Sequence, residues 1–172
     1  MILNIGCEFA KRQDCVNIDM SPEVKPDVIC KAEELPFKDN SVDGIYMHNL
    51  LEHTTGTLRV MEEAHRVCRQ NAFVDIVAPH FSSRSAWASP DHLKAFSLNS
   101  FWNFMPNRTH RHYKPVFLVD ERKLIYSKNT NIFDRLINWL ARKIPDTFER
   151  RFVFLFGGCD EIHVKLRAVK ND

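Results

Sequence analysis

The spacing of the strand-like runs is the feature that most limits what this chain can fold into. Only ten residues lie between Ile5 and Val16, and only eight lie between Asp19 and Val28. A crossover between parallel strands normally takes about a dozen residues or more, most of them in a helix. If these runs are parallel neighbours, their crossover helices are reduced to turns, and one face of the sheet lacks its usual helical cover.

Strand-like and helix-like segments alternate along the chain, which indicates an α/β fold. Short apolar or β-branched runs predict strands at 2–5, 16–18, 28–30, 42–47 and 73–78. The spacing of apolar residues predicts helices at 57–69, 97–105 and 132–144, and strands at 116–126 and 161–169. No repeat or linker interrupts the pattern, so residues 1–172 are expected to form a single domain, divided into 1–105 and 106–172.

Charge and cysteine content narrow the class of protein. The 24 Lys and Arg residues nearly balance 22 Asp and Glu, so the chain is not expected to bind nucleic acid. No apolar run approaches the roughly 20 residues of a membrane span, and the N-terminus does not resemble a secretory signal, which favours a cytoplasmic location. The 5 cysteines contain no C-x-x-C pair, so free thiols are expected, and no metal site is predicted.

The helix expected at 132–144 is a candidate cover for the under-covered sheet face. A second subunit is the other candidate, so a homodimer is predicted through that face or through this helix. The basic residues Arg135, Arg142 and Lys143 would also suit a helix lying on a membrane surface. Packing against protein is the more economical interpretation.

Gly6 and Asp19 follow the first two predicted strands and suggest a nucleotide-like ligand. A glycine at a strand end lets a ligand approach the backbone closely. An acid at the end of the next strand can accept hydrogen bonds from both hydroxyls of a ribose. Taken singly, each residue is more often part of turn chemistry. Glycine is scarce, with 5 where an average usage near ~7% would give about 12, so any glycine-rich loop must be shortened here.

Together with several later segments, this pattern resembles the class I S-adenosylmethionine-dependent methyltransferases, particularly small ones with a truncated first crossover. The segments that carry the resemblance are 3–7, 16–19, 32–43, 45–53, 61–67, 73–79 and 91–101. The resemblance implies a Rossmann-like methyltransferase fold with a mostly parallel central sheet, an antiparallel C-terminal strand and reduced helices on one face. Residues 1–105 would then be the cofactor-binding core.

The resemblance also implies roles for individual residues, with S-adenosylmethionine as the cofactor. The backbone at Gly6 and Cys7 would approach the methionine part, and Asp19 would bind the ribose hydroxyls. Ala32, with Glu33 beside it, would lie next to the adenine. His48, just past the fourth strand, would lie near the sulfonium end.

Methyl transfer requires that the acceptor be positioned and, for a hydroxyl or an amine, deprotonated. Histidine suits proton removal at neutral pH. His80 is the preferred base and His92 the second choice, although a structural role in the loop is at least as probable for either, and His53 is interpreted as structural. The expected reaction is methyl transfer to a small-molecule, sugar or lipid-linked acceptor.

Some residues depart from the family pattern and keep an alternative open. Glu8 and Phe9 follow Cys7 where further glycines are usual, and Lys31 replaces the acid that commonly precedes the position of Ala32. The alternative is a non-catalytic binding or regulatory module on the same fold. The segment 109–114 is basic and could touch phosphate, but a solvated loop is favoured. Its two histidines have no nearby acid or cysteine to complete a metal site.

Overall fold

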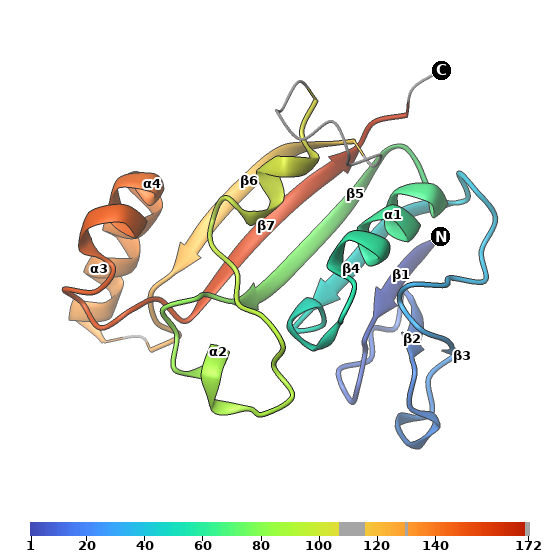
Figure 1. The fold of residues 1–172 in the computed structure, drawn as a ribbon, viewed down its shortest axis with the longest axis horizontal. Helices are drawn as coiled ribbons and strands as arrows, with labels where there is room; N and C mark the ends of the chain where they lie inside the picture. The colour runs from blue at the N-terminus through green and yellow to red at the C-terminus, as the bar shows by residue number, and fades with distance from the viewer. Residues whose placement is uncertain (107–115, 130, 171–172) are drawn as a thin grey trace.

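The computed structural model describes residues 1–106, 116–129 and 131–170, so the basic segment 109–114 lies outside the described residues. Within them, a 7-stranded sheet has the order β3-β2-β1-β4-β5-β7-β6 (Figure 1). The strands are β1 (Ile2–Ile5), β2 (Val16–Asp19), β3 (Val28–Ile29), β4 (Val42–His48), β5 (Cys68–Pro79), β6 (Phe117–Ile125) and β7 (Glu161–Ala168). β7 runs antiparallel to β5 and β6, and the other neighbouring pairs are parallel. This confirms the predicted α/β fold and its antiparallel C-terminal strand.

Helices are few on one side of this sheet. The α-helices are α1 (Thr57–Val67), α2 (Ser85–Ala88), α3 (Ile132–Lys143) and α4 (Pro145–Thr147). Other helical turns are η1 (Pro22–Val24), η2 (Leu51–His53), η3 (Ser100–Phe104) and η4 (Phe148–Phe152). The β1–β2 connection has no helix and the β2–β3 connection has only η1, as the short spacings predict. None of the described helices has the length and apolar character needed to cross a bilayer.

Two predicted helices differ from the structure. The helix expected at 57–69 ends at Val67, because Cys68 takes an extended conformation and pairs with Val42 at the start of β5. The helix expected at 97–105 is only the short turn η3. The Ser100 hydroxyl accepts a hydrogen bond from the Ser97 backbone N–H at 2.9 Å, and such local bonds compete with a regular helix.

The two faces of the sheet have different chemistry, as the register shows. One row of directly paired residues is fully buried: Leu3, Ile45, Val74 and Leu166. The next row, which points to the opposite face, is polar: Asn4, Tyr46, Asp75 and Lys165. Because strand side chains alternate in direction, the face with little helical cover is built from polar residues and does not need an apolar lid.

The C-terminal helix α3 does not cover the polar face. Figure 1 shows α3 and α4 at the end of the sheet beyond β6. The helix buries Ile137 and Ala141 and packs against β6, while Leu136 and Trp139 stay exposed. The predicted cover of the sheet face by this helix is therefore wrong, because the helix lies at the sheet's end. The homodimer through either surface stays a prediction.

Candidate functional site

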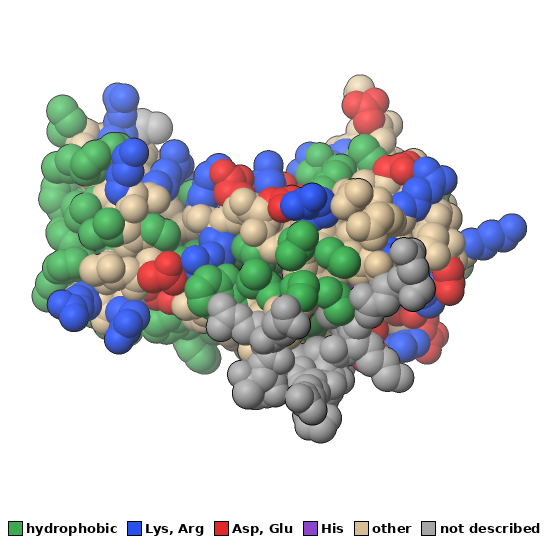
Figure 2. Space-filling view, turned by 90° about the horizontal axis from the view of Figure 1, so that it is seen from above, with side chains coloured by type: hydrophobic (Ala, Val, Ile, Leu, Met, Phe, Trp, Pro, Cys, Tyr) green, Lys and Arg blue, Asp and Glu red, His purple; other side chains and the backbone are tan. Residues whose placement is uncertain are grey.

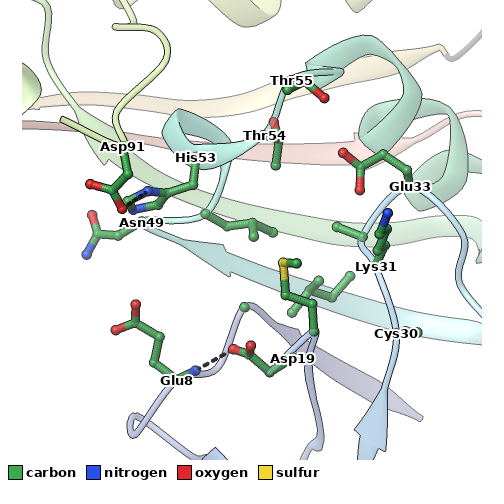
Figure 3. Close-up of a pocket in the computed structure, with 15 residues that line it drawn as sticks. Glu8, Asp19, Cys30, Lys31, Glu33, Asn49, His53, Thr54, Thr55 and Asp91 are labelled. Carbon is green, nitrogen blue, oxygen red and sulfur yellow. Dashed lines mark hydrogen bonds and ion pairs between the residues drawn. The ribbon is translucent and has the colours of Figure 1, made fainter. Parts of the chain in front are cut away.

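A pocket of about 430 Å³ lies at the carboxyl ends of β1 to β4 (Figure 3). This is the edge of an open α/β sheet where ligands are expected. It is lined by Ile5, Gly6, Glu8, Asp19, Met20, Cys30, Lys31, Ala32, Glu33, Asn49, Leu50, His53, Thr54, Thr55 and Asp91. Of the predicted cofactor-site residues, Gly6, Asp19, Ala32 and Glu33 are brought together here.

Gly6 has a conformation and a neighbour that both favour glycine. Its φ is +69°, and its N–H donates to the carbonyl of Ile18 at 2.8 Å. A Cβ at this position would lie only 2.7 Å from Cδ1 of Leu50. Glu8, two residues later, also has a positive φ of 40°, a region that side-chain-bearing residues rarely occupy. The loop therefore keeps a glycine-like backbone even where glycine is absent.

Asp19 is fixed at the end of β2 by the backbone around it. One carboxylate oxygen accepts the N–H of Glu8 and the other accepts the N–H of Ser21, both at 2.9 Å. Each oxygen has further lone-pair capacity toward the pocket. A rigid carboxylate of this kind can accept hydrogen bonds from two adjacent hydroxyls.

The segment after β3 supplies the far wall of the pocket. Ala32 is nearly buried, and within the described residues its backbone N–H donates to no partner. That N–H is available to a ring nitrogen of a bound base. Lys31 also lines the pocket, but its ammonium can only donate, so it cannot accept hydrogen bonds from an adenine amino group.

Two predicted cofactor residues lie outside this pocket. Cys7 is buried, and burial raises the pKa of its thiol. His48 points to the polar sheet face, where its Nε2 lies 2.8 Å from Asp75. His163 contacts the same carboxylate oxygen at 2.8 Å, and Arg12 lies 3.4 Å from Nδ1 of His48. Since strand residues alternate between faces, a position at the end of β4 did not ensure that His48 would face the cofactor edge.

The polar-face cluster is a set of hydrogen bonds around one carboxylate. Burial would raise the pKa of Asp75, but hydrogen bonds from His163 and His48 outweigh it and hold that pKa well below its usual range. Arg12 and Lys165 place two more cations next to this cluster.

A second pocket of about 490 Å³ adjoins the first and shares Glu8, Asn49 and His53 with it. His92 lines this second pocket, as does Glu52 of η2. Glu52 is 1% exposed, and no described residue forms a hydrogen bond with either of its carboxylate oxygens. Burial raises the pKa of this carboxyl. Glu52 was not predicted from the sequence as a site residue; its only signal was an acid beside His53 a few residues after a predicted strand.

His80 is fully buried and lines neither pocket. Its Nε2 lies 2.9 Å from Glu149, and its Nδ1 lies 2.6 Å from the Ser82 hydroxyl. Both ring nitrogens are thus engaged inside the protein, which is the structural role that the sequence left open. His92, the second choice, is the histidine of the predicted pair that reaches a pocket.

The comparisons with known proteins agree with this geometry. Residues 5–75 match the family model described as a methyltransferase domain. No curated protein is significantly similar in sequence. Among solved structures, the YcgJ protein of Bacillus subtilis is 16% identical, with 99% of this chain and 92% of that chain covered and a TM-score of 0.60.

Two further structures share the fold. A S-adenosylmethionine-dependent methyltransferase from Archaeoglobus fulgidus is 15% identical over 96% of this chain and 85% of that one, with a TM-score of 0.60. A methyltransferase of Haloferax volcanii, solved in complex with the Trm112 methyltransferase activator, is 14% identical over 99% and 82%, with a TM-score of 0.63. The chain therefore has the Rossmann-like methyltransferase fold. The family match and the fold together support a class I S-adenosylmethionine-dependent methyltransferase with S-adenosylmethionine as its cofactor.

Proposed function

We propose that the chain transfers the methyl group of S-adenosylmethionine to a small-molecule, sugar or lipid-linked acceptor bound in the second pocket. The observation that carries this proposal is the pair of adjoining pockets at the carboxyl edge of the sheet, which share Glu8, Asn49 and His53. A two-substrate transfer needs two sites in contact, so that donor and acceptor can meet in line.

The residues of the first pocket fit the cofactor. Asp19 offers two fixed carboxylate oxygens to the ribose hydroxyls, and Ala32 offers a free N–H to the adenine. Gly6 lets the backbone approach the methionine part. When bound, S-adenosylmethionine supplies a methyl carbon activated by a sulfonium leaving group.

The second pocket supplies groups that can hold an acceptor and take its proton. His92 is the candidate base of the metal-free chain, because it lines this pocket. His53 is held by Asp91 at 3.0 Å and lies between the two pockets. Histidine is suited to proton removal near neutral pH.

Isothermal titration with S-adenosylmethionine and with S-adenosylhomocysteine tests cofactor binding. Asp19→Ala should weaken binding by about 10- to 100-fold, because hydrogen bonds to a charged group contribute about 1.5–3 kcal/mol. Asp14→Ala, an exposed aspartate before the same strand, is the matched control and should bind normally. Absence of binding by the unaltered chain, or equal binding by Asp19→Ala, would contradict the proposal.

The alternative is a non-catalytic module that uses the same fold to bind a ligand or a partner. Glu8 in place of a glycine and Lys31 in place of an acid favour it. Methyl transfer from labelled cofactor to any acceptor, lost in Asp19→Ala, would decide against this alternative. A reducing, cytoplasmic setting is part of the main proposal, because free thiols fit such a setting and Cys7, Cys15, Cys30, Cys68 and Cys159 are all free.

A further inference from the structure

Glu52, His53 and His92 form a cluster whose ligand atoms all lie within 4.8 Å of one another. Glu52 and His53 belong to η2, and His92 lies in the segment after α2. A hydrogen bond from the Leu93 N–H to the Glu52 carbonyl, at 2.8 Å, joins that segment to η2. Both carboxylate oxygens of Glu52 and Nδ1 of His92 are buried without a hydrogen-bond partner among the described residues. Buried polar atoms are normally paired, so these atoms point to a missing ligand.

The surroundings of this cluster favour a cation. Asp91 holds the ring of His53 at 3.0 Å, the arrangement in which a carboxylate orients a metal-binding histidine. Asp160 and Glu161 line the same pocket, and the nearby Lys128 is already paired with Glu161 at 2.6 Å.

The polar-face cluster has the same residue types and the opposite electrostatics. Asp75 there is already hydrogen-bonded by both His48 and His163 at 2.8 Å. Arg12 lies 3.4 Å from His48 and would repel a divalent ion, and Lys165 lies between Asp75, at 3.8 Å, and Glu121, at 4.0 Å. This second cluster therefore serves as an internal comparison.

We propose that Glu52, His53 and His92 bind one divalent transition-metal ion, of which Zn²⁺ is the best match. One carboxylate oxygen and two imidazole nitrogens are the ligand set of a catalytic zinc site, which keeps an open position for substrate. The open position would face the second pocket and orient an oxygen of the acceptor, and His92 would then be a ligand of the ion and not the base. That role rests on the proposed function, whereas ion binding itself does not. No metal site was predicted from the sequence, because His92 follows the adjacent pair Glu52 and His53 only 39 positions later and the three carry no recognised ligand spacing.

Titration of the chelator-treated chain with Zn²⁺ tests the site, with bound metal measured by isothermal titration and by elemental analysis. One equivalent should bind. His92→Ala should weaken binding by more than about 100-fold, because losing a residue that only orients a metal ligand already weakens binding by about 10- to 100-fold. Glu52→Gln should do the same, and Asp91→Ala should cost about 10- to 100-fold. His163→Ala in the polar-face cluster is the matched control and should bind normally. Circular dichroism checks that each variant is folded.

The outcomes separate this inference from the proposed function. No zinc binding, or binding unchanged in His92→Ala and Glu52→Gln, would overturn the metal site. Loss of binding in His163→Ala alone would place the ion at the polar-face cluster instead. Titration of S-adenosylmethionine on the same samples reports the cofactor pocket independently, so failure of one does not imply failure of the other.

A different observation concerns the exposed surface of the segment 131–156, which we call the terminal surface. Exposed apolar residues gather on it: Ile132, Phe133, Leu136, Trp139, Ile144, Phe154 and Leu155. Exposed cations lie among them: Arg135, Arg142, Lys143, Arg150 and Arg151. Figure 2 shows hydrophobic and basic side chains together at this end of the molecule.

The acidic residues of the same segment do not offset these cations. Asp134 and Glu149 are buried, and Asp146 is paired with Arg122 at 3.2 Å. Within the described part of the chain, no ion pair involves the exposed arginines or Lys143 of the terminal surface. A symmetric dimer through this surface would bring like charges together, which is unfavourable.

We infer that the terminal surface binds an anionic lipid bilayer. An amphipathic helix with exposed aromatic and aliphatic residues beside Lys and Arg binds at such an interface through both apolar burial and charge. Phe154 also contacts Phe81 in the loop after β5, with ring centroids 6.1 Å apart, so the surface continues toward the acceptor edge of the sheet.

Flotation with vesicles of phosphatidylcholine, with and without phosphatidylglycerol, tests this inference. Binding should require phosphatidylglycerol and weaken with salt, and Arg142→Gln with Lys143→Gln should reduce it about 25-fold, at about five-fold per cation. Leu136→Asp with Trp139→Asp should abolish it. Ile29→Asp, at an equally exposed apolar residue on β3, should not. Absence of vesicle binding would overturn the inference, as would sedimentation showing a dimer that Leu136→Asp dissociates.

Discussion

Replacing Glu52 with glutamine should stabilise the metal-free chain at neutral pH. The carboxylate is 1% exposed, and its oxygens have no described hydrogen-bond partner. A buried polar group left unpaired costs about 1–3 kcal/mol, and more when it is charged. Glutamine keeps the shape and removes the charge. A gain of about 1–3 kcal/mol corresponds to an increase in Tm of about 2–12 °C for a chain of this size.

The pH dependence follows from the direction of the pKa shift. Burial raises the pKa of Glu52 above its ordinary value of 4.5. Below that value the carboxyl is protonated in both the folded and unfolded chain, so the variant has little advantage. As pH rises through the higher pKa of the folded state, the unaltered chain must ionise a buried group and loses stability. The difference between the two proteins should therefore grow from acid to neutral pH.

Zinc should narrow the difference in stability between the two proteins, and should reverse it where that difference is below about 2.7 kcal/mol. A ligand at about 100 times its Kd stabilises the folded chain by about 2.7 kcal/mol, and only the chain with an intact Glu52 should gain this. Thermal melts of both proteins, with chelator and with Zn²⁺, measure the effect at several pH values. Glu23→Gln, at an exposed glutamate, should change stability by less than about 0.5 kcal/mol. A metal-free Glu52→Gln that is less stable than the parent at neutral pH would refute the reasoning.

Three further substitutions test the loop after β1 and the buried His80. Gly6→Ala should cost about 1–2 kcal/mol from its positive φ alone, with an added clash that Leu50→Ala relieves; chemical denaturation of the single and double variants separates the two. Glu8→Gly should relieve a similar backbone strain but raise the conformational entropy of the unfolded chain, so denaturation should show a net change in stability within about 1 kcal/mol. A larger loss of stability would mean that the Glu8 side chain is structurally required. His80→Ala should destabilise by about 1–3 kcal/mol because it removes a buried hydrogen-bond partner of Glu149 and leaves it the Leu98 N–H, and the folded fraction should still bind cofactor in a titration.

Sequence reasoning was most successful where the relevant information is local. Gly6 and Asp19 line the first pocket because Gly6 directly follows β1 and Asp19 is the last residue of β2, and parallel strands end at one edge of the sheet. Ala32 and Glu33 follow β3 in the same way. The strand positions and the short connections were predictable for the same reason.

The residues that sequence reasoning misplaced depend on distant partners. The burial of His80 depends on Glu149, which lies 69 positions later in the chain. Glu52 and His92 meet only because the segment after α2 folds back onto η2. His48 is the last residue of β4 and so lies at the carboxyl edge of the sheet, but its side chain lies on the polar face because side chains alternate along a strand. Periodicity and spacing carry no information about such contacts.

The loop after β1 shows what the low glycine content of the chain means for the cofactor pocket. Glu8 stands where a glycine is usual, yet it has a φ of 40° and donates its N–H to Asp19 at 2.9 Å. That bond ties the loop to the carboxylate expected to bind the ribose, and it offsets part of the conformational cost of a non-glycine residue. The loop has thus lost the glycine and kept its conformation. The change from glycine to Glu8 therefore does not show that the cofactor loop has been lost, and Lys31 is the departure that still favours the non-catalytic alternative.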